Sequence, residues 1–309
     1  MGPRSYVLVL GLAVLSLLPK GAQAYVREVT KSGVPVAWRY PCVTMQIYLG
    51  SAPPVVTADA FFAASAQAAG VWSYPTLACT DIRLAMVAEA QASADVGHDT
   101  QNVIMFRQDT WCRQPTPVDD AGTPQPDCYP SSALAITSIF KNSKTGEILD
   151  ADIEFNAVDY SWGDLEGQRA LATSNTADFQ NALTHELGHV LGLDHNCFTA
   201  NDAQARLNDN TGAPEVDCNS TLPDTILNAT MYPSVVLIDT QRRTLSLDDE
   251  QGVCDIYPHL HEVCPVRPSD SGCSVLTMAP SHRTRTALLC TTLGLLVAAL
   301  AFLRKRLRV

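Results

Sequence analysis

Short apolar segments with the character of β-strands occupy the first half of the chain. They contain β-branched or aromatic residues and are separated by stretches rich in Gly, Pro, Asn, Asp or Ser. This pattern predicts strands at residues 43–49, 82–87, 103–106, 133–140 and 148–155. Residues 142–146, between the last two strands, have the composition of a turn.

Helical spacing appears in three other segments. The alanine-rich segment 57–72 predicts a helix with Thr57 as its N-cap and Asp59 in its first turn. Residues 245–257 are also helix-like. A helix that begins after Thr176, the expected N-cap, has apolar residues at near-helical intervals, at positions 179, 182, 183, 187, 190 and 191.

The N-terminus has the features of an export signal. Arg4 precedes an apolar run at 6–18, and Ala22-Gln23-Ala24 fits a cleavage site of small residues. We therefore expect residues 1–24 to be a signal peptide and the mature chain to start at Tyr25.

A second apolar stretch, Ala287 to Leu303, is followed by a basic end, so residues 287–309 are expected to form a membrane or sorting segment. Seventeen residues are near the lower limit for a membrane span, and the basic end should stay cytoplasmic. A plain anchor is one interpretation. The other is a resemblance to the C-terminal sorting signals of some Gram-negative bacteria, in which Cys273 would be the processed residue. Both place the protein outside the inner membrane, as an extracellular or envelope-tethered protein.

Between these ends we expect one domain at 25–258, followed by a linker at 259–286 that contains several Pro and Ser residues. The ends contain nine of the 21 basic residues and one of the 32 acidic residues, which leaves 12 basic and 31 acidic residues for 25–263. Such an acidic surface excludes nucleic acid as a partner. It suits a well-solvated exported protein, and calcium is an alternative ligand, with 150–154 as the candidate segment.

The ten cysteines indicate an oxidising compartment. Chain order suggests disulfides between neighbours, although eight cysteines allow about 105 pairings. Zinc binding by these cysteines is less favoured, because no Cys-x-x-Cys spacing occurs. The expected pairs are Cys42–Cys79, Cys112–Cys128, Cys197–Cys218 and Cys254–Cys264.

The motif His185-Glu186-x-x-His189-x-x-Gly192-x-x-His195 carries the candidate chemistry. Positions i and i+4 share one face of a helix, so His185 and His189 can bind the same ion. Gly192 can leave the helix through a left-handed conformation and bring His195 back as a third ligand. Three imidazoles leave a fourth position open, which is typical of a catalytic zinc site.

This motif resembles the metzincin clan of zinc endopeptidases. Thr230-Met231-Tyr232-Pro233 lies where the clan has its methionine turn, and Met-Tyr-Pro is similar to the matrixin version, including bacterial relatives. Asn196 departs from the Ser or Thr that matrixins usually carry after the third histidine. The resemblance implies an α+β zincin-like fold, in which a twisted five-stranded mixed sheet packs on two helices, one being the active-site helix, followed by a C-terminal helix.

The resemblance also implies a reaction and a substrate class. Glu186 would be the general base that activates water for hydrolysis of an internal peptide bond, with zinc as cofactor and proteins or peptides as substrates. Met231 would form a packed floor beneath the zinc. The segment 133–137 would be the edge strand to which a peptide adds, with Leu134 and Ala135 as contacts. Pro233 and Ser234 would wall the pocket for the side chain that follows the scissile bond.

Other interpretations belong to different classes of protein. A cell-surface binding module that keeps zinc as a structural element is the main alternative, but such a module has no use for Glu186. An exopeptidase would need charges that bind a chain terminus, and the sequence shows none. His98, between Asp95 and Asp99, could belong to a second metal site, although a surface loop is favoured because only one histidine is present.

Overall fold

The computed structural model of the chain describes residues 25–89, 96–113, 123, 127–168, 172–199 and 207–260. All of them belong to one compact unit, Met1–Cys264. The expected signal peptide at 1–24, the segment 287–309 and nearly all of the linker 259–286 lie outside the described residues. Within the described part, none of the helices has both the length and the apolar character that crossing a bilayer requires.

A five-stranded mixed sheet forms the framework of this unit, as expected from the strand pattern. Its order is β3-β2-β4-β6-β5, with only β5 antiparallel to its neighbour. Because β5 pairs on one side only, its outer edge is open. The strands are β2 (Cys42–Tyr48), β3 (Arg83–Glu89), β4 (Val103–Arg107), β5 (Ala135–Lys141) and β6 (Ile148–Asn156).

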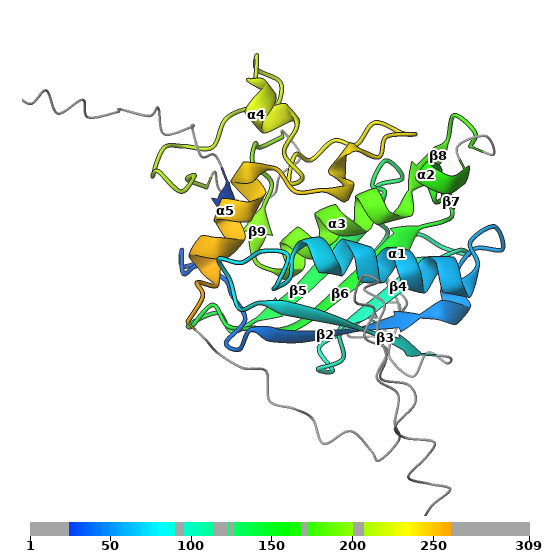
Figure 1. Cartoon of the computed structure of the whole chain (residues 1–309), viewed down its shortest axis with the longest axis horizontal. Helices are drawn as coiled ribbons and strands as arrows, with labels where there is room; N and C mark the ends of the chain where they lie inside the picture. Colours follow the sequence, from blue (N-terminus) through cyan, green and yellow to red (C-terminus); the bar gives the residue numbers. More distant parts are fainter. Residues whose placement is uncertain are drawn as a thin grey trace, which may run out of the picture. The chain divides into compact units, whose positions relative to one another are not determined.

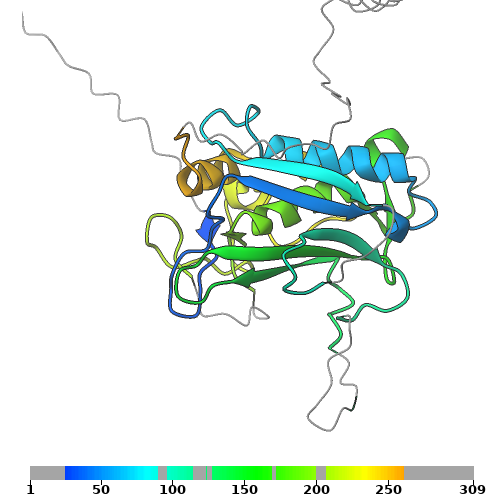
Figure 2. The same ribbon diagram turned by 90° about the horizontal axis from the view of Figure 1, so that it is seen from below.

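Two long helices, α1 (Ala58–Val71) and α3 (Phe179–Val190), lie side by side against one face of the sheet (Figure 1). Seen from below, β2 and β3 run alongside α1 (Figure 2). Thr57 caps α1 as predicted, through a hydrogen bond from the Ala60 amide. The prediction of Thr176 as the cap of α3 was wrong. Asp178, the last residue of the short strand Thr176–Asp178, takes this role because its carboxylate accepts the Asn181 amide.

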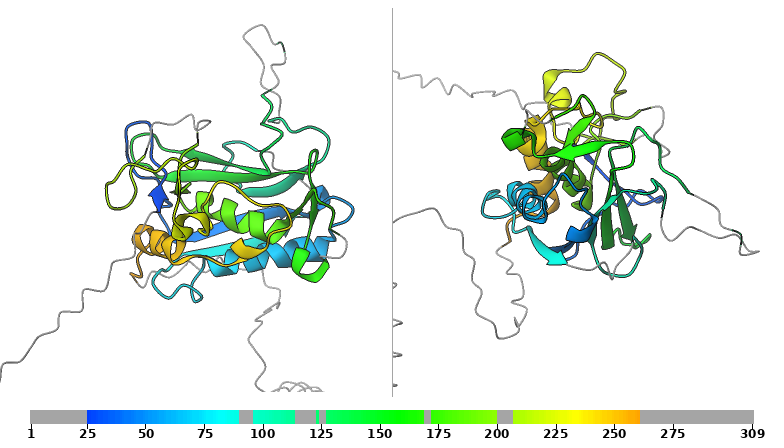
Figure 3. Two further views of the ribbon diagram at one scale, coloured as in Figure 1. Left: turned by 90° about the horizontal axis from the view of Figure 1, so that it is seen from above. Right: turned by 90° about the vertical axis from the view of Figure 1, so that its right-hand side faces the viewer.

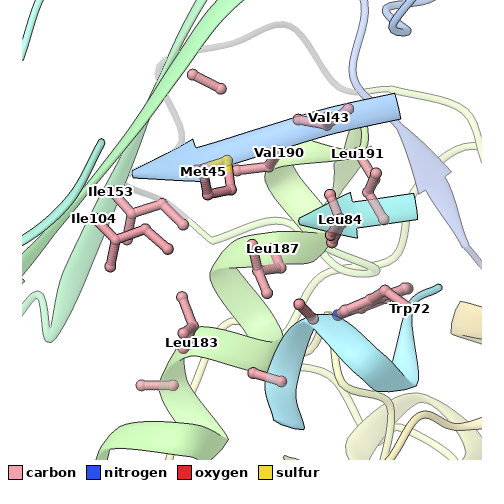
Figure 4. Packing of buried hydrophobic residues seen from close by; sticks show 14 of the residues in the cluster. Val43, Met45, Trp72, Leu84, Ile104, Ile153, Leu183, Leu187, Val190 and Leu191 are labelled. Atoms are coloured by element: carbon pink, nitrogen blue, oxygen red, sulfur yellow. The ribbon is translucent and has the colours of Figure 1, made fainter. Parts of the chain in front are cut away.

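The core lies between the sheet and these helices. Leu183, Leu187, Val190 and Leu191 of the α3 region point toward apolar side chains of β2, β3, β4 and β6 (Figure 4). Trp72, at the end of α1, is fully buried and donates from its indole nitrogen to the Thr184 carbonyl at 2.8 Å. This packing fixes the position of α3, the helix that carries the histidine motif.

Shorter elements surround α3. Of these, α5 and β9 lie at one end of the unit, and β7, β8 and α2 lie at the other (Figures 1 and 3). α3 therefore runs from the β8 end toward the β9 end. The elements are β1 (Val26–Arg27), η1 (Leu49–Ser51), β7 (Ser161–Gly163), α2 (Leu165–Gln168), β8 (Thr176–Asp178), β9 (Leu193–Asp194), α4 (Asp224–Leu227), η3 (Gln241–Arg243) and α5 (Leu247–Ile256).

The acidic segment 150–154 lies in β6 and has a structural explanation. Its three carboxylate residues are fully buried. Asp152 accepts hydrogen bonds from the amides of Gly97 and Val103, and burial raises its pKa to about 7. Glu154 pairs with an arginine of β4 at 2.5 Å. The carboxylates of Asp152 and Glu154 thus anchor a loop and a neighbouring strand.

Three disulfides join described cysteines. Cys112–Cys128 and Cys197–Cys218 confirm two predictions. The third joins Cys79 to Cys254, so the predicted Cys42–Cys79 and Cys254–Cys264 pairs were wrong. Cys42 is also disulfide-bonded. Chain order failed because the end of α5 folds back onto the segment after α1, where the His259 amide donates to the Cys79 carbonyl.

We expect Cys79–Cys254 to be the most stabilising of the three disulfides. It closes a loop of 175 residues, whereas Cys112–Cys128 spans 16. The double variant Cys79→Ser/Cys254→Ser should lower the free energy of unfolding by about 3–5 kcal/mol, and Cys112→Ser/Cys128→Ser by less. Denaturant unfolding measures both values. A non-reducing digest that links Cys79 to Cys42 would contradict the assignment.

Candidate metal centre

Three histidines come together at the C-terminal half of α3 and the turn that follows it. His185 and His189 lie one turn apart on the helix, as their spacing predicts. The turn requires a glycine, because Gly192 has a φ of +85° and a Cβ there would lie 2.5 Å from the Val36 carbonyl oxygen. This close turn directs β9 back along the helix, so that His195 faces the other two histidines.

The donor atoms of these histidines converge on one point. The Nε2 atom of His195 lies 3.3 Å from the Nε2 atoms of both His185 and His189. Donors held at about 2.0–2.1 Å from a tetrahedral ion lie roughly 3.3–3.4 Å apart, so the spacing suits a small transition-metal ion. Among the described residues, these three histidines are the cluster of potential metal ligands whose donor atoms lie close enough together to hold an ion.

Backbone carbonyls orient two of the three imidazoles. The Nδ1 atom of His185 lies 2.6 Å from the Thr230 carbonyl oxygen, and that of His189 lies 2.9 Å from the Leu193 carbonyl oxygen. A carbonyl can only accept, so each Nδ1 carries the proton and each Nε2 keeps its lone pair. Burial, followed by the charge of His189, lowers the pKa of His195 to about 3. Burial likewise holds the pKa of His185 well below its usual value. The imidazoles of His185 and His195 are therefore neutral and ready to act as ligands.

Glu186 is buried beside the histidines. Burial raises the pKa of its carboxyl, while His189 and a hydrogen bond from Thr137 lower it. The Thr137 hydroxyl donates to Oε2 at 2.5 Å. Thr137 lies in the middle of β5, so this bond connects the edge strand to the helix and fixes the orientation of the carboxylate.

Met231 lies directly beneath α3. A Cβ on Gly188 would approach the Met231 sulfur to 2.2 Å, so only glycine allows the turn to pack so closely. Asn196, the departure noted in the sequence, lies in the third ligand segment. Its backbone N–H donates to the Met231 carbonyl at 3.2 Å, and its side-chain amide donates to the Ile226 carbonyl at 3.0 Å. The turn itself is held by Asp249 of α5, which accepts the amides of Thr230 and Met231 at 2.7 and 3.1 Å.

A cavity of about 730 Å³ runs between α3 and β5. The three histidines and Glu186 line it, and so do the four residues predicted to contact substrate: Leu134, Ala135, Pro233 and Ser234. At one end Ala182 and Leu237 complete the wall. At the other end Glu28 and Asp194 contribute carboxylates, which the sequence did not single out.

Sequence reasoning missed most of the supporting contacts. Three of them involve Thr137, the Thr230 carbonyl and Glu28, which come from segments whose proximity to α3 depends on the folded chain. The Leu193 carbonyl lies within the histidine motif itself. Asp249 could have been recognised, because Ser246 and Asp249 form a capping box at the start of α5. His98 lies apart from the histidine cluster, and its ring stacks on Phe140 with a centroid separation of 5.7 Å.

No family model and no curated protein matches this chain. Among solved structures, one described as "Structure of Myroilysin" is 16% identical, with a TM-score of 0.35 over 75% of this chain and 84% of that one. A TM-score of this size does not establish a common fold.

The buried Asp249 carboxylate should be essential for the stability of this centre. In Asp249→Asn, an NH₂ group would face backbone amides that need an acceptor, so we expect a loss of about 2–4 kcal/mol in unfolding free energy. Glu250→Gln removes the same charge from the same first turn of α5 and should change stability by less than about 0.5 kcal/mol. Denaturant titration of both variants provides the comparison, and equal midpoints would contradict the assigned role.

Proposed function

We propose that this protein is a metal-dependent hydrolase that cleaves internal peptide bonds. The observation that carries the proposal is the convergence of three Nε2 atoms beside a buried carboxylate, inside a cavity bordered by an open strand edge. More specifically, we propose a zinc endopeptidase of the metzincin type with matrixin-like features. The histidine motif, the Met231 turn beneath Gly188 and the five-stranded mixed sheet support this assignment.

Zinc is the metal that best fits the donor set. Three imidazoles with this spacing match its preference for nitrogen ligands and tetrahedral geometry, and they leave one position for water or substrate. When bound, zinc would act as a Lewis acid that acidifies water and polarises the scissile carbonyl. Calcium has no comparable site among the described residues and stays a prediction.

Glu186 moves the proton in the proposed reaction. Its carboxylate takes a proton from the attacking water and passes it to the amine that leaves as the C–N bond breaks. Thr137 holds Oε2, so the other carboxylate oxygen remains for the water. The hydrogen bond from Thr137 also lowers the pKa of Glu186, which opposes the effect of burial and favours the basic form.

The open edge of β5 would bind the substrate backbone. An extended peptide can add to this edge by main-chain hydrogen bonds, with its side chains alternately facing the cavity. Leu134 and Ala135 would contact the peptide. Pro233, Ser234 and Leu237, which all line the cavity, would wall the pocket for the side chain after the scissile bond. Leu237 lies near the start of α3, because the amide of its neighbour Ile238 donates to the Thr176 carbonyl.

The disulfides indicate an oxidising environment, so the proposed enzyme acts outside the cytoplasm. Tethering through residues 287–309 stays a prediction, because that segment lies outside the described residues.

Replacing Glu186 should separate metal binding from catalysis. We expect Glu186→Gln to retain zinc and to lose activity on casein or gelatin by roughly 10²–10⁴-fold, because the amide cannot take a proton. Zinc content per chain and the rate of internal cleavage give the two readouts.

Glu250→Gln is the matched control, since it changes the same chemical group outside the cavity. It should cleave like the unmodified protein, and a chelator should abolish that cleavage. Zinc binding without cleavage of any protein substrate by the unmodified chain would instead favour a binding module. Full activity of Glu186→Gln would rule out the mechanism.

A further inference from the structure

The end of the cavity near His195 is acidic, and this property has a consequence for substrate choice. We propose that Asp194 and Glu28 form a subsite for a basic side chain, lysine or arginine, located before the scissile bond of the substrate. This inference rests on the proposed endopeptidase function and adds a substrate class to it.

The side chains of Glu28 and Asp194 lie on the same face of the β1–β9 pair because of its antiparallel register. β1 pairs with β9 in antiparallel register, with Val26 opposite Asp194, and the Glu28 amide continues the pairing by donating to the Gly192 carbonyl. Directly opposite residues in an antiparallel pair, and residues two apart in a strand, point to the same side. Glu28 and Asp194 therefore both face the cavity, and both line it.

The position of Glu28 and Asp194 along α3 determines whether they meet substrate residues before or after the scissile bond. Ala182 and Leu237 lie near the start of the helix, and Ile238 bonds to Thr176 just before that start. Asp194 follows the end of the helix. The catalytic group, Glu186, lies between these two ends. If the pocket near Leu237 takes the side chain after the scissile bond, the acidic end takes side chains before it.

The balance of charge at this end favours a cation. The acidic residues that line this end of the cavity are Glu28 and Asp194, and no described Lys or Arg lines the cavity. Glu28 is already paired with Lys141, which lies outside the lining. Asp194 is half-buried, accepts its neighbour's amide at 2.7 Å through Oδ1, and forms no ion pair within the described chain.

A half-buried carboxylate in a concave site attracts a cation more strongly than an exposed carboxylate does, because less water screens it. The opposite end of the cavity is lined by apolar groups, among them Leu134, Pro233, Val235 and Leu237. The preferred substrate thus has a basic residue within three positions before the cleaved bond and an apolar residue directly after it.

The test uses the zinc-loaded protein and three peptides that differ at one position before the cleaved bond, with lysine, methionine or glutamate. The chain should give kcat/KM values in the order lysine, methionine, glutamate. Asp194→Asn keeps an oxygen for the His195 amide, and it should reduce the lysine-to-methionine ratio about five- to tenfold. Asp109→Asn removes the same charge from an exposed residue outside the cavity and should keep the ratio.

Added salt should also reduce the lysine preference of the unmodified protein. Retained zinc shows that a variant is folded, and Glu28→Gln replaces Asp194→Asn if the latter loses zinc. Chelator-sensitive cleavage of all three peptides at equal rates would overturn the subsite and leave the endopeptidase intact. An unchanged lysine-to-methionine ratio of kcat/KM in Asp194→Asn and Glu28→Gln would likewise overturn the subsite and leave the endopeptidase intact. If no peptide or protein is cleaved, the endopeptidase proposal fails, and with it the substrate subsite.

Discussion

One buried carboxylate, that of Asp249, connects the C-terminal helix to the metal centre. It accepts the amides of Thr230 and Met231, and the Thr230 carbonyl in turn lies 2.6 Å from Nδ1 of His185. A carboxylate satisfied by several donors tolerates burial, whereas the same amides without an acceptor would each cost about 1–3 kcal/mol. The orientation of the first histidine thus depends on a residue 64 positions away in the sequence.

Close packing adds a second constraint on the same turn. Gly188 lets the Met231 sulfur approach the helix, and Trp72 packs against the same position. Trp72 is in turn fixed by its bond to the Thr184 carbonyl. The helix is therefore held between the sheet-side core and the methionine turn. A methionine suits this place because its flexible thioether fills an irregular gap without competing for the metal.

Local signals allowed much of this arrangement to be predicted. The strand pattern located all five strands of the sheet, and the histidine motif located the candidate metal centre, because the three histidines lie within eleven residues. The failures involve contacts between distant segments. Thr176 lost the capping role to Asp178, and Cys79 pairs with Cys254 because α5 packs back on the segment after α1. Spacing along the chain carries no information about such contacts.

Burial has opposite effects on the two kinds of titratable group in the cavity. It lowers the pKa of His185 and His195 and raises that of Glu186, so it favours the neutral form of each. A bound cation would reverse this preference for the carboxylate while still requiring neutral imidazoles. His185 and His195 are thus already in the state that metal binding needs, and Thr137 provides the bond that keeps Glu186 oriented when it is ionised. The metal and the base would then depend on each other: the cation favours the ionised carboxylate, and the ionised carboxylate is the form that can accept the proton.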